Sequence, residues 1–148
     1  MVETSVIIPC YNEQDAIGGL LQALDHQTYH RKKMAVIIAD GMSTDRTREV
    51  IQAFQDRHPD LTVKVIDNPD QTIPSALNLA LEEARGAYIV RLDAHSNPAE
   101  DYLSRSLRAL RQDKGDNIGG VLAIQPGSQT WMGRSIAVAA AHPLGMGD

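Results

Sequence analysis

Asp93 and His95 are two residues apart, at the end of an apolar segment that begins at Ala87. In extended backbone, residues i and i+2 point to the same side, so this carboxylate and this imidazole can reach one ion or one diphosphate. Carboxylate oxygens suit Mg²⁺ or Mn²⁺, and an imidazole favours Mn²⁺. Arg91, two residues earlier, can share that side. The plainer alternative is that Asp93 and Asn97 only cap the following helix, while His95 is solvated.

A second polar segment places Asp40 and Asp45 on either side of a turn that contains Gly41 and Ser43. A carboxylate at the end of a strand can accept hydrogen bonds from a nucleobase N–H or from ribose hydroxyls. The same residues also fit an ordinary turn in which Asp45 complements the dipole of the next helix. In a third polar segment, Tyr11 can stack on a base, although a single tyrosine after a strand more often packs.

Short apolar runs predict the strands that position these segments, and stretches with helical periodicity separate the runs. We expect strands over 5–8, 35–39, 61–66, 87–92 and 119–124. Strands that alternate with helices predict an α/β domain with a mostly parallel sheet and flanking helices. In such a sheet ligands bind beyond the carboxyl ends of the strands, which is where the three polar segments lie.

Several local predictions concern the helices. Asn12 is the expected N-cap of the first helix, and Ser43 or Thr44 that of the second. The pair Asn97-Pro98 is expected to open the helix that contains Leu103 and Leu107. Asn78 lies within an apolar helical stripe, which predicts a buried polar side chain that bonds a neighbouring loop.

The composition and the absence of common motifs argue against several classes of protein. The chain has 148 residues with a formal net charge of −5, which argues against a nucleic-acid-binding surface. A single cysteine, Cys10, excludes an internal disulfide framework and a Cys-rich zinc site, and it fits a reducing, cytoplasmic compartment. No Walker A motif is present and no G-x-G-x-x-G follows the first strand, so ATPases and common dinucleotide-dependent dehydrogenases are disfavoured.

Four motifs occur together in a familiar order: Val6–Glu13, Ala39–Asp45, Ala76-Leu77-Asn78 and Arg91–His95. Over residues 5–124 their spacing resembles family 2 glycosyltransferases of the GT-A fold. The Arg-x-Asp-Ala-His form looks most like the succinoglycan-biosynthesis type, bacterial enzymes that build exopolysaccharide on a lipid-linked carrier. The resemblance implies the Rossmann-like, nucleotide-binding half of that fold.

The resemblance also implies roles for particular residues. Asp93 and His95 would hold Mn²⁺ or Mg²⁺ on the diphosphate of a nucleotide-sugar donor, with His95 where the family more often has a second Asp. The nucleotide itself would be bound by Pro9, Tyr11, Glu13, Asp40, Ser43, Asp45 and Arg91. A UDP-sugar is the expected donor, and a saccharide or a lipid-linked saccharide is the expected acceptor.

Family members that invert the anomeric carbon take their catalytic base from an acceptor-binding half, which would lie beyond Asp148. We therefore expect a nucleotide-sugar-binding domain over 1–125 and the apolar start of an acceptor-side region over 126–148. Such a fragment would bind donor, transfer little sugar alone, and self-associate through its apolar tail. The parent enzyme would work at the cytoplasmic face of the inner membrane.

Two other functions compete with this interpretation. One is a non-catalytic nucleotide-binding or assembly module, in which Asp93 and His95 are purely structural. The other is a sugar-nucleotide pyrophosphorylase, which is disfavoured because the loop at Pro9–Glu13 lacks the Gly-rich, basic signature of that class.

Overall fold

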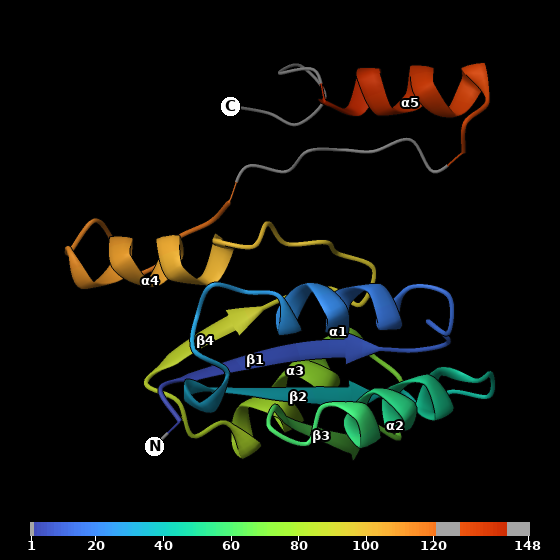
Figure 1. Cartoon of the computed structure of the whole chain (residues 1–148). Helices are drawn as coiled ribbons and strands as arrows, with labels where there is room; N and C mark the ends of the chain where they lie inside the picture. Colours follow the sequence, from blue (N-terminus) through green and yellow to red (C-terminus); the bar gives the residue numbers. More distant parts are fainter. Residues whose placement is uncertain (1, 121–127, 142–148) are drawn as a thin grey trace. The chain divides into compact units, whose positions relative to one another are not determined.

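The structure is a computed structural model that describes residues 2–120 and 128–141. It divides into two units, Met1–Asp116 and Asn117–Asp148. The first unit holds a four-stranded parallel sheet in the order β3-β2-β1-β4 (Figure 1). Its strands are β1 (Thr4–Cys10), β2 (Met34–Asp40), β3 (Thr62–Asp67) and β4 (Tyr88–Arg91); its helices are α1 (Ile17–Asp25), η1 (Arg31–Lys33), α2 (Thr47–Arg57), α3 (Ile73–Glu83) and α4 (Tyr102–Arg111).

The two central strands are buried on both faces because helices cover each side of the sheet. On one face, Val6 and Ile8 pack with the apolar stripes of α1 and α2 and with Leu103 of α4. On the other face, Ile7 and Ile37 pack against α3, whose small inward residues include Ala76. Figure 1 shows α3 on the opposite side of the sheet from α1 and α2. This layering fixes the carboxyl ends of β1, β2 and β4 at one edge.

The four strands predicted up to Leu92 are confirmed, and β3 is the more exposed edge strand that its alternating pattern indicates. The strand expected over 119–124 lies mostly outside the described residues. α1 forms despite two consecutive glycines. A Cβ built on Gly18 would lie 3.3 Å from Val50 Cγ1, so the absent side chain leaves room for α2 to approach.

Three helix starts differ from the predictions. Asn12 is not an N-cap, because α1 begins at Ile17 and Asn12 instead holds the next loop through its side chain. Neither Ser43 nor Thr44 caps α2; Asp45 accepts the hydrogen bond from the Thr47 backbone N–H.

α4 begins at Tyr102 rather than at Asn97-Pro98. The Glu100 carbonyl accepts from the Thr28 N–H, and the Ala99 carbonyl accepts from Nε2 of Gln27 as well as from the Tyr102 N–H. The side chain of Gln27 donates to Ala99 and accepts from the Leu103 N–H at 3.1 Å, so it caps α4 from a distant part of the chain.

Asn78 is exposed on α3, so the prediction of a buried polar side chain there is wrong. The apolar stripe that suggested burial belongs to Ala76 and Ala80, which face the sheet. A helix presents only one face to the core, and Asn78 lies on the other.

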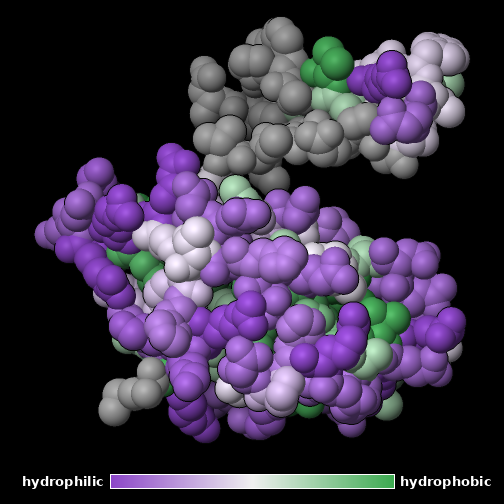
Figure 2. Space-filling model, viewed as in Figure 1, coloured by the Kyte–Doolittle hydropathy of each residue, from purple (hydrophilic) through white to green (hydrophobic). Residues whose placement is uncertain are grey.

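The second unit contains α5 (Trp131–Ala141), whose exposed side chains include Trp131, Met132, Ile136 and Val138. In the face of the molecule drawn in Figure 2, hydrophilic residues cover most of the first unit. No helix within 2–120 or 128–141 has the length and apolar character needed to cross a membrane.

Candidate functional site

A cleft of about 220 Å³ lies beyond the carboxyl ends of the parallel strands. Six of the nine residues predicted for the site line it, namely Pro9, Tyr11, Glu13, Arg91, Asp93 and His95. Asp40, Ser43 and Asp45 are not among the lining residues. The cleft is smaller than the roughly 300–1,000 Å³ typical of small-molecule sites, so the described residues enclose only part of a ligand the size of a nucleotide sugar.

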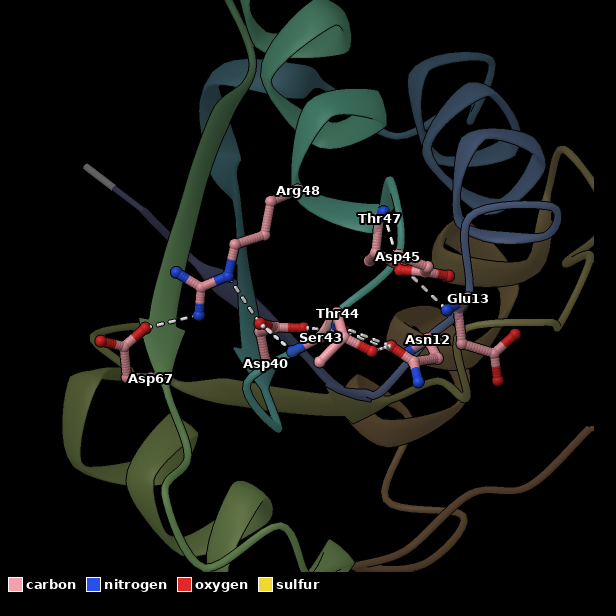
Figure 3. A network of polar contacts seen from close by, with 9 residues as sticks. All are labelled: Asn12, Glu13, Asp40, Ser43, Thr44, Asp45, Thr47, Arg48 and Asp67. Carbon is pink, nitrogen blue, oxygen red and sulfur yellow. Dashed lines mark hydrogen bonds and ion pairs between the residues drawn. The ribbon is translucent and has the colours of Figure 1, made fainter.

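Asp40 lies behind the cleft, where its carboxylate is fully buried. It accepts hydrogen bonds from the Ser43 N–H at 3.1 Å, from Ser43 Oγ at 2.5 Å and from Arg48 Nε at 2.7 Å. Figure 3 shows Arg48 between Asp40 and Asp67, with one arm of the guanidinium toward each. A buried carboxylate needs such compensation, and here the contacts also shape the turn after β2.

The loops after β1 and β2 are joined directly. Asn12 donates its backbone N–H to Ser43 Oγ at 2.9 Å, and its side-chain Oδ1 accepts from the Thr44 N–H at 2.8 Å. Asn12 and Met42 both have positive φ values, 52° and 61°, which L residues seldom adopt without tertiary support. The two loops therefore hold each other in a conformation that neither favours alone.

Asp45 supports the same junction from the start of α2. Its carboxylate accepts from Thr47 Oγ1 at 2.5 Å, from the Thr47 N–H at 2.9 Å and from the Gln14 N–H at 3.2 Å. Desolvation raises the pKa of Asp45, but these hydrogen bonds outweigh it and leave the pKa below its usual value. Its observed contacts are with the protein's own loops.

The loop after β4 brings charged groups to the cleft. Arg91 pairs with Asp93, with 3.1 Å between Nη2 of the guanidinium and Oδ1 of the carboxylate. His95 Nδ1 lies 3.2 Å from Oε1 of Glu13, in the loop after β1. The predicted metal-binding loop thus contacts the predicted nucleotide-binding loop across the cleft.

A divalent ion fits this donor set only if another molecule supplies further ligands. Among the residues described, no group of three or more His, Cys, Asp or Glu side chains is arranged to hold a metal ion. The predicted metal ligands Asp93 and His95 contribute one carboxylate and one imidazole to the lining of the cleft, and Glu13 contributes a second carboxylate. Mg²⁺ is commonly bound by one or two carboxylates together with substrate phosphates and water, so the two side chains fit an ion that arrives with a diphosphate.

Asn68 is a lining residue that the sequence analysis missed. It is 2% exposed; its Nδ2 donates to the Thr72 carbonyl at 3.0 Å, whereas its Oδ1 is buried without a hydrogen-bond partner among the described residues. Such an acceptor is costly unless a ligand or water satisfies it. The sequence feature that could have identified Asn68 is its position directly after β3, because the other polar lining residues also lie at or after the ends of strands.

Two further lining residues shape the floor of the cleft. A Cβ on Gly41 would lie 3.3 Å from the ring of Tyr11, so the glycine lets the Tyr11 ring rest against the backbone. Cys10 is buried, as expected for a packing residue. Desolvation raises the pKa of its thiol to about 12, with nearby carboxylates including Asp40 adding to the shift, so the sulfur is a protonated thiol at neutral pH.

A larger hollow, about 680 Å³, involves the opposite end of the sheet. Three of its charged lining residues already pair with each other: Arg31 lies 3.1 Å from both Asp25 and Asp60. The smaller cleft at the carboxyl ends of the strands collects the side chains suited to chemistry, and it is the candidate site.

Known proteins resemble this chain in sequence and in fold. The sequence model of "Glycosyl transferase family 2" matches residues 5–145. Glycosyltransferase AglE of Haloferax volcanii is 33% identical over 116 residues, which are 78% of this chain and 38% of that protein. Succinoglycan biosynthesis protein ExoA of Rhizobium meliloti is 32% identical over 144 residues, 96% of this chain and 42% of that protein.

A solved structure agrees with these sequence matches. Mannosyltransferase PcManGT from Pyrobaculum calidifontis, in complex with GDP-Man and Mn²⁺, has a TM-score of 0.70 and 34% identity, over 73% of this chain and 32% of that one. The GT-A fold predicted from the sequence is thereby confirmed. The chain spans about two-fifths of the length of the curated relatives named above. With most of its length matched by the family, the chain belongs to glycosyl transferase family 2.

Proposed function

We propose that this chain is the donor-binding part of a metal-dependent, inverting glycosyltransferase that uses a nucleotide diphosphate sugar. The observation that carries the proposal is the cleft beyond β1, β2 and β4, where Tyr11, Asp93 and His95 meet. The likeness to a mannosyltransferase bound to GDP-Man and Mn²⁺ supports both the donor class and the ion. The acceptor is a saccharide or lipid-linked saccharide in exopolysaccharide synthesis, as the similarity to ExoA suggests.

Each lining residue has a part in the proposed binding mode. The exposed ring of Tyr11 stacks on the base, while Oδ1 of Asn68, which has no partner among the described residues, accepts a hydrogen bond from a base N–H. Pro9 completes the wall of this half of the cleft, whereas the carboxylate of Glu13 lies against His95. Asp40, Ser43 and Asp45 act from behind, by fixing the loops that carry these side chains.

The diphosphate lies at the other half of the cleft. Asp93 and His95 supply the protein ligands for a divalent ion, and Arg91 offers a positive charge beside them. When bound, Mn²⁺ or Mg²⁺ stabilises the negative charge of the departing nucleoside diphosphate. The base that deprotonates the acceptor hydroxyl is assigned to the parent enzyme beyond Asp148, so the chain alone should bind donor far better than it transfers sugar.

Calorimetric titration with UDP, GDP and TDP, each with Mn²⁺ and with chelator, tests the proposal. We expect one of the nucleotides, UDP, to bind in a Mn²⁺-dependent manner. In Asp93→Ala, we expect nucleotide binding to lose its dependence on Mn²⁺. Glu49→Ala is a matched control, because Glu49 lies exposed on α2 and pairs only with the exposed Arg46 among the described residues. A folded chain that binds none of the three nucleotides would overturn the assignment.

The same titration distinguishes the proposed glycosyltransferase from a non-catalytic nucleotide-binding or assembly module. In a non-catalytic module with a structural Asp93, nucleotide affinity would not depend on Mn²⁺, and Asp93→Ala would change stability rather than metal dependence. The exposed position of the Arg91–Asp93 pair favours a ligand role, because exposed ion pairs contribute only about 0–1 kcal/mol to stability.

The proposal also includes self-association through α5 and a cellular location. Trp131, Ile136 and Val138 expose enough apolar surface on α5 for self-association of the chain, which sedimentation velocity over a range of concentrations would detect. A monomer at every concentration would exclude it. We assign a cytoplasmic site of action, with the parent enzyme at the inner membrane, from the similarity to the biosynthetic protein ExoA.

A further inference from the structure

In the contact between Glu13 and His95, the donor and the acceptor can be assigned. Oε1 of Glu13 lies 3.2 Å from Nδ1 of His95, and the two residues are 82 positions apart in the sequence. A carboxylate only accepts hydrogen bonds, so Nδ1 must carry the hydrogen in this contact. In the neutral ring this contact selects the tautomer whose Nε2 has a free lone pair, which is the form that binds metal ions.

Glu13 is well placed to hold the ring because its own backbone is fixed on both sides. Its N–H donates to Thr47 Oγ1 at 2.8 Å, and its carbonyl accepts from the Ala16 and Ile17 N–H groups at 3.0 Å and 2.9 Å. Figure 3 shows the carboxylate of Glu13 pointing away from the network that its backbone joins. The side chain is only 27% exposed, whereas that of His95 is 70% exposed, so Glu13 is the better anchored partner.

Two alternatives for Glu13 fit the structure less well. As a third protein ligand it would form a cluster with Asp93 and His95 able to hold an ion, and the described residues contain no such cluster of three. As a contact to the ribose or base, which the family resemblance implies, it would bind mainly through Oε2, because Oε1 already lies against Nδ1 of His95.

We propose that Glu13 is a positioning residue that orients His95 and fixes its tautomer for metal binding. A carboxylate behind a metal-binding histidine raises the basicity of the ligand and sets its orientation. The inference rests on the proposed function for its metal, but the state of the ring in the free protein can be measured independently. It gives the loop after β1 a part in metal binding, although that loop supplies no ligand.

The first measurement is the tautomer of His95 in the free protein, from two-bond ¹H–¹⁵N correlation spectra at mildly alkaline pH. We expect the Nδ1–H form in the wild type, the same form in Glu13→Gln, whose amide oxygen still accepts, and the Nε2–H form in Glu13→Ala. Glu49→Ala, on the exposed face of α2, should match the wild type. A wild-type ring in the Nε2–H form would overturn the proposal.

The second measurement is Mn²⁺ affinity, followed by the electron paramagnetic resonance of free Mn²⁺ in the presence of UDP or GDP. Glu13→Ala should weaken Mn²⁺ binding by about 10- to 100-fold, the usual loss when such a partner is removed. Nucleotide binding measured with chelator should be unchanged. Glu13→Ala should also add no further loss of Mn²⁺ affinity in a His95→Ala background, because Glu13 acts only through that ring.

The outcomes separate this inference from the proposed function. Additive losses in the double variant, or weaker nucleotide binding in chelator, would mean that Glu13 contacts the nucleotide and would overturn its positioning role. Absence of Mn²⁺-dependent binding in the wild type would contradict the proposed function and with it the metal-binding purpose of the contact. The tautomer measurement would still decide whether Glu13 holds the ring.

Discussion

Arg48 and Asp40 form an ion pair in which only one partner reaches solvent. The carboxylate of Asp40 is fully buried, whereas the side chain of Arg48 is 45% exposed and extends further to Asp67 at the end of β3. One guanidinium therefore compensates a buried charge and links the ends of two neighbouring strands. Asn68, the residue after Asp67, lines the cleft, and its buried Oδ1 has no hydrogen-bond partner among the described residues.

Replacing Arg48 with Met should destabilise the fold by about 1–3 kcal/mol, because Asp40 would stay buried without its cation. The value lies below that for a fully buried pair because Arg48 is half exposed and Ser43 continues to donate two hydrogen bonds. Urea denaturation measures the change. Arg46→Met is the matched control on the same helix, since Arg46 pairs only with exposed Glu49 in the described structure and should change stability by less than about 0.5 kcal/mol. Equal effects of the two changes would contradict this account.

Asn68→Ala should weaken nucleotide binding by roughly 2- to 13-fold, the equivalent of one net hydrogen bond of about 0.5–1.5 kcal/mol. The loss should be present with and without Mn²⁺, because Asn68 is assigned to the base rather than to the diphosphate. Titration calorimetry measures it. Asn78→Ala serves as the control, since Asn78 is exposed on α3. Unchanged affinity in Asn68→Ala would leave its buried oxygen to a water molecule.

The thiol of Cys10 should react slowly with iodoacetamide in the folded protein, since burial raises its pKa to about 12. A raised pKa means that the thiolate fraction keeps rising about tenfold per pH unit well above pH 8.5, where an ordinary thiol begins to level off. Intact-mass analysis of the alkylated chain against pH measures this dependence. In denaturing urea the reaction should become fast and level off near the ordinary pKa. A plateau at that pH in the folded protein would refute the effect of burial.

Two glycine substitutions should have opposite signs. A Cβ on Gly86 would lie 2.6 Å from the Ser5 backbone nitrogen, where β4 begins to pair with β1, so Gly86→Ala should destabilise the fold by at least about 1–3 kcal/mol. A Cβ on Gly19 meets nothing within 4 Å inside α1, so Gly19→Ala should stabilise the fold by about 0.4–1 kcal/mol. Thermal unfolding of both variants beside the wild type tests the pair, and a shift of the same sign in each would contradict the packing argument.

The sequence predicted the strands well because runs such as Val6–Ile8 leave few alternatives to a buried strand. It also predicted which segments would meet, since the carboxyl ends of parallel strands share one edge. The order of the strands was less accessible. β4 pairs with β1, more than eighty residues away, and no local pattern encodes that choice of partner.

The misplaced helix starts have a common cause. Asn12 and the Asn97-Pro98 pair carry typical local start signals, but in the folded chain their neighbourhoods are used by distant partners. The Thr44 N–H donates to the side chain of Asn12. The side chain of Gln27 donates to the Ala99 carbonyl and accepts from the Leu103 N–H in the first turn of α4. A capping preference of about 1 kcal/mol is easily outweighed by such tertiary contacts.

The candidate site was predicted by residue type more securely than by role. Asp40 and Asp45 were expected to touch the nucleotide, and the contacts observed for them are with Ser43, Arg48 and Thr47. A carboxylate that binds a ligand and one that organises a turn have the same sequence signature, and only burial and hydrogen bonds distinguish them. Their nucleotide contacts remain predictions.

The network behind the cleft divides the loops into two sets of positions that can change independently. Asp40, Ser43 and Asp45 maintain the loop backbones, while the side chains of Tyr11, Ile73 and other lining residues project into the cleft without belonging to that network. Substitutions at exposed lining positions such as Tyr11 and Ile73 can therefore change the surface of the cleft at little cost to folding. For engineering, a library confined to these exposed positions should retain a high fraction of folded members, whereas one that includes the network or the buried lining residues should lose most of them.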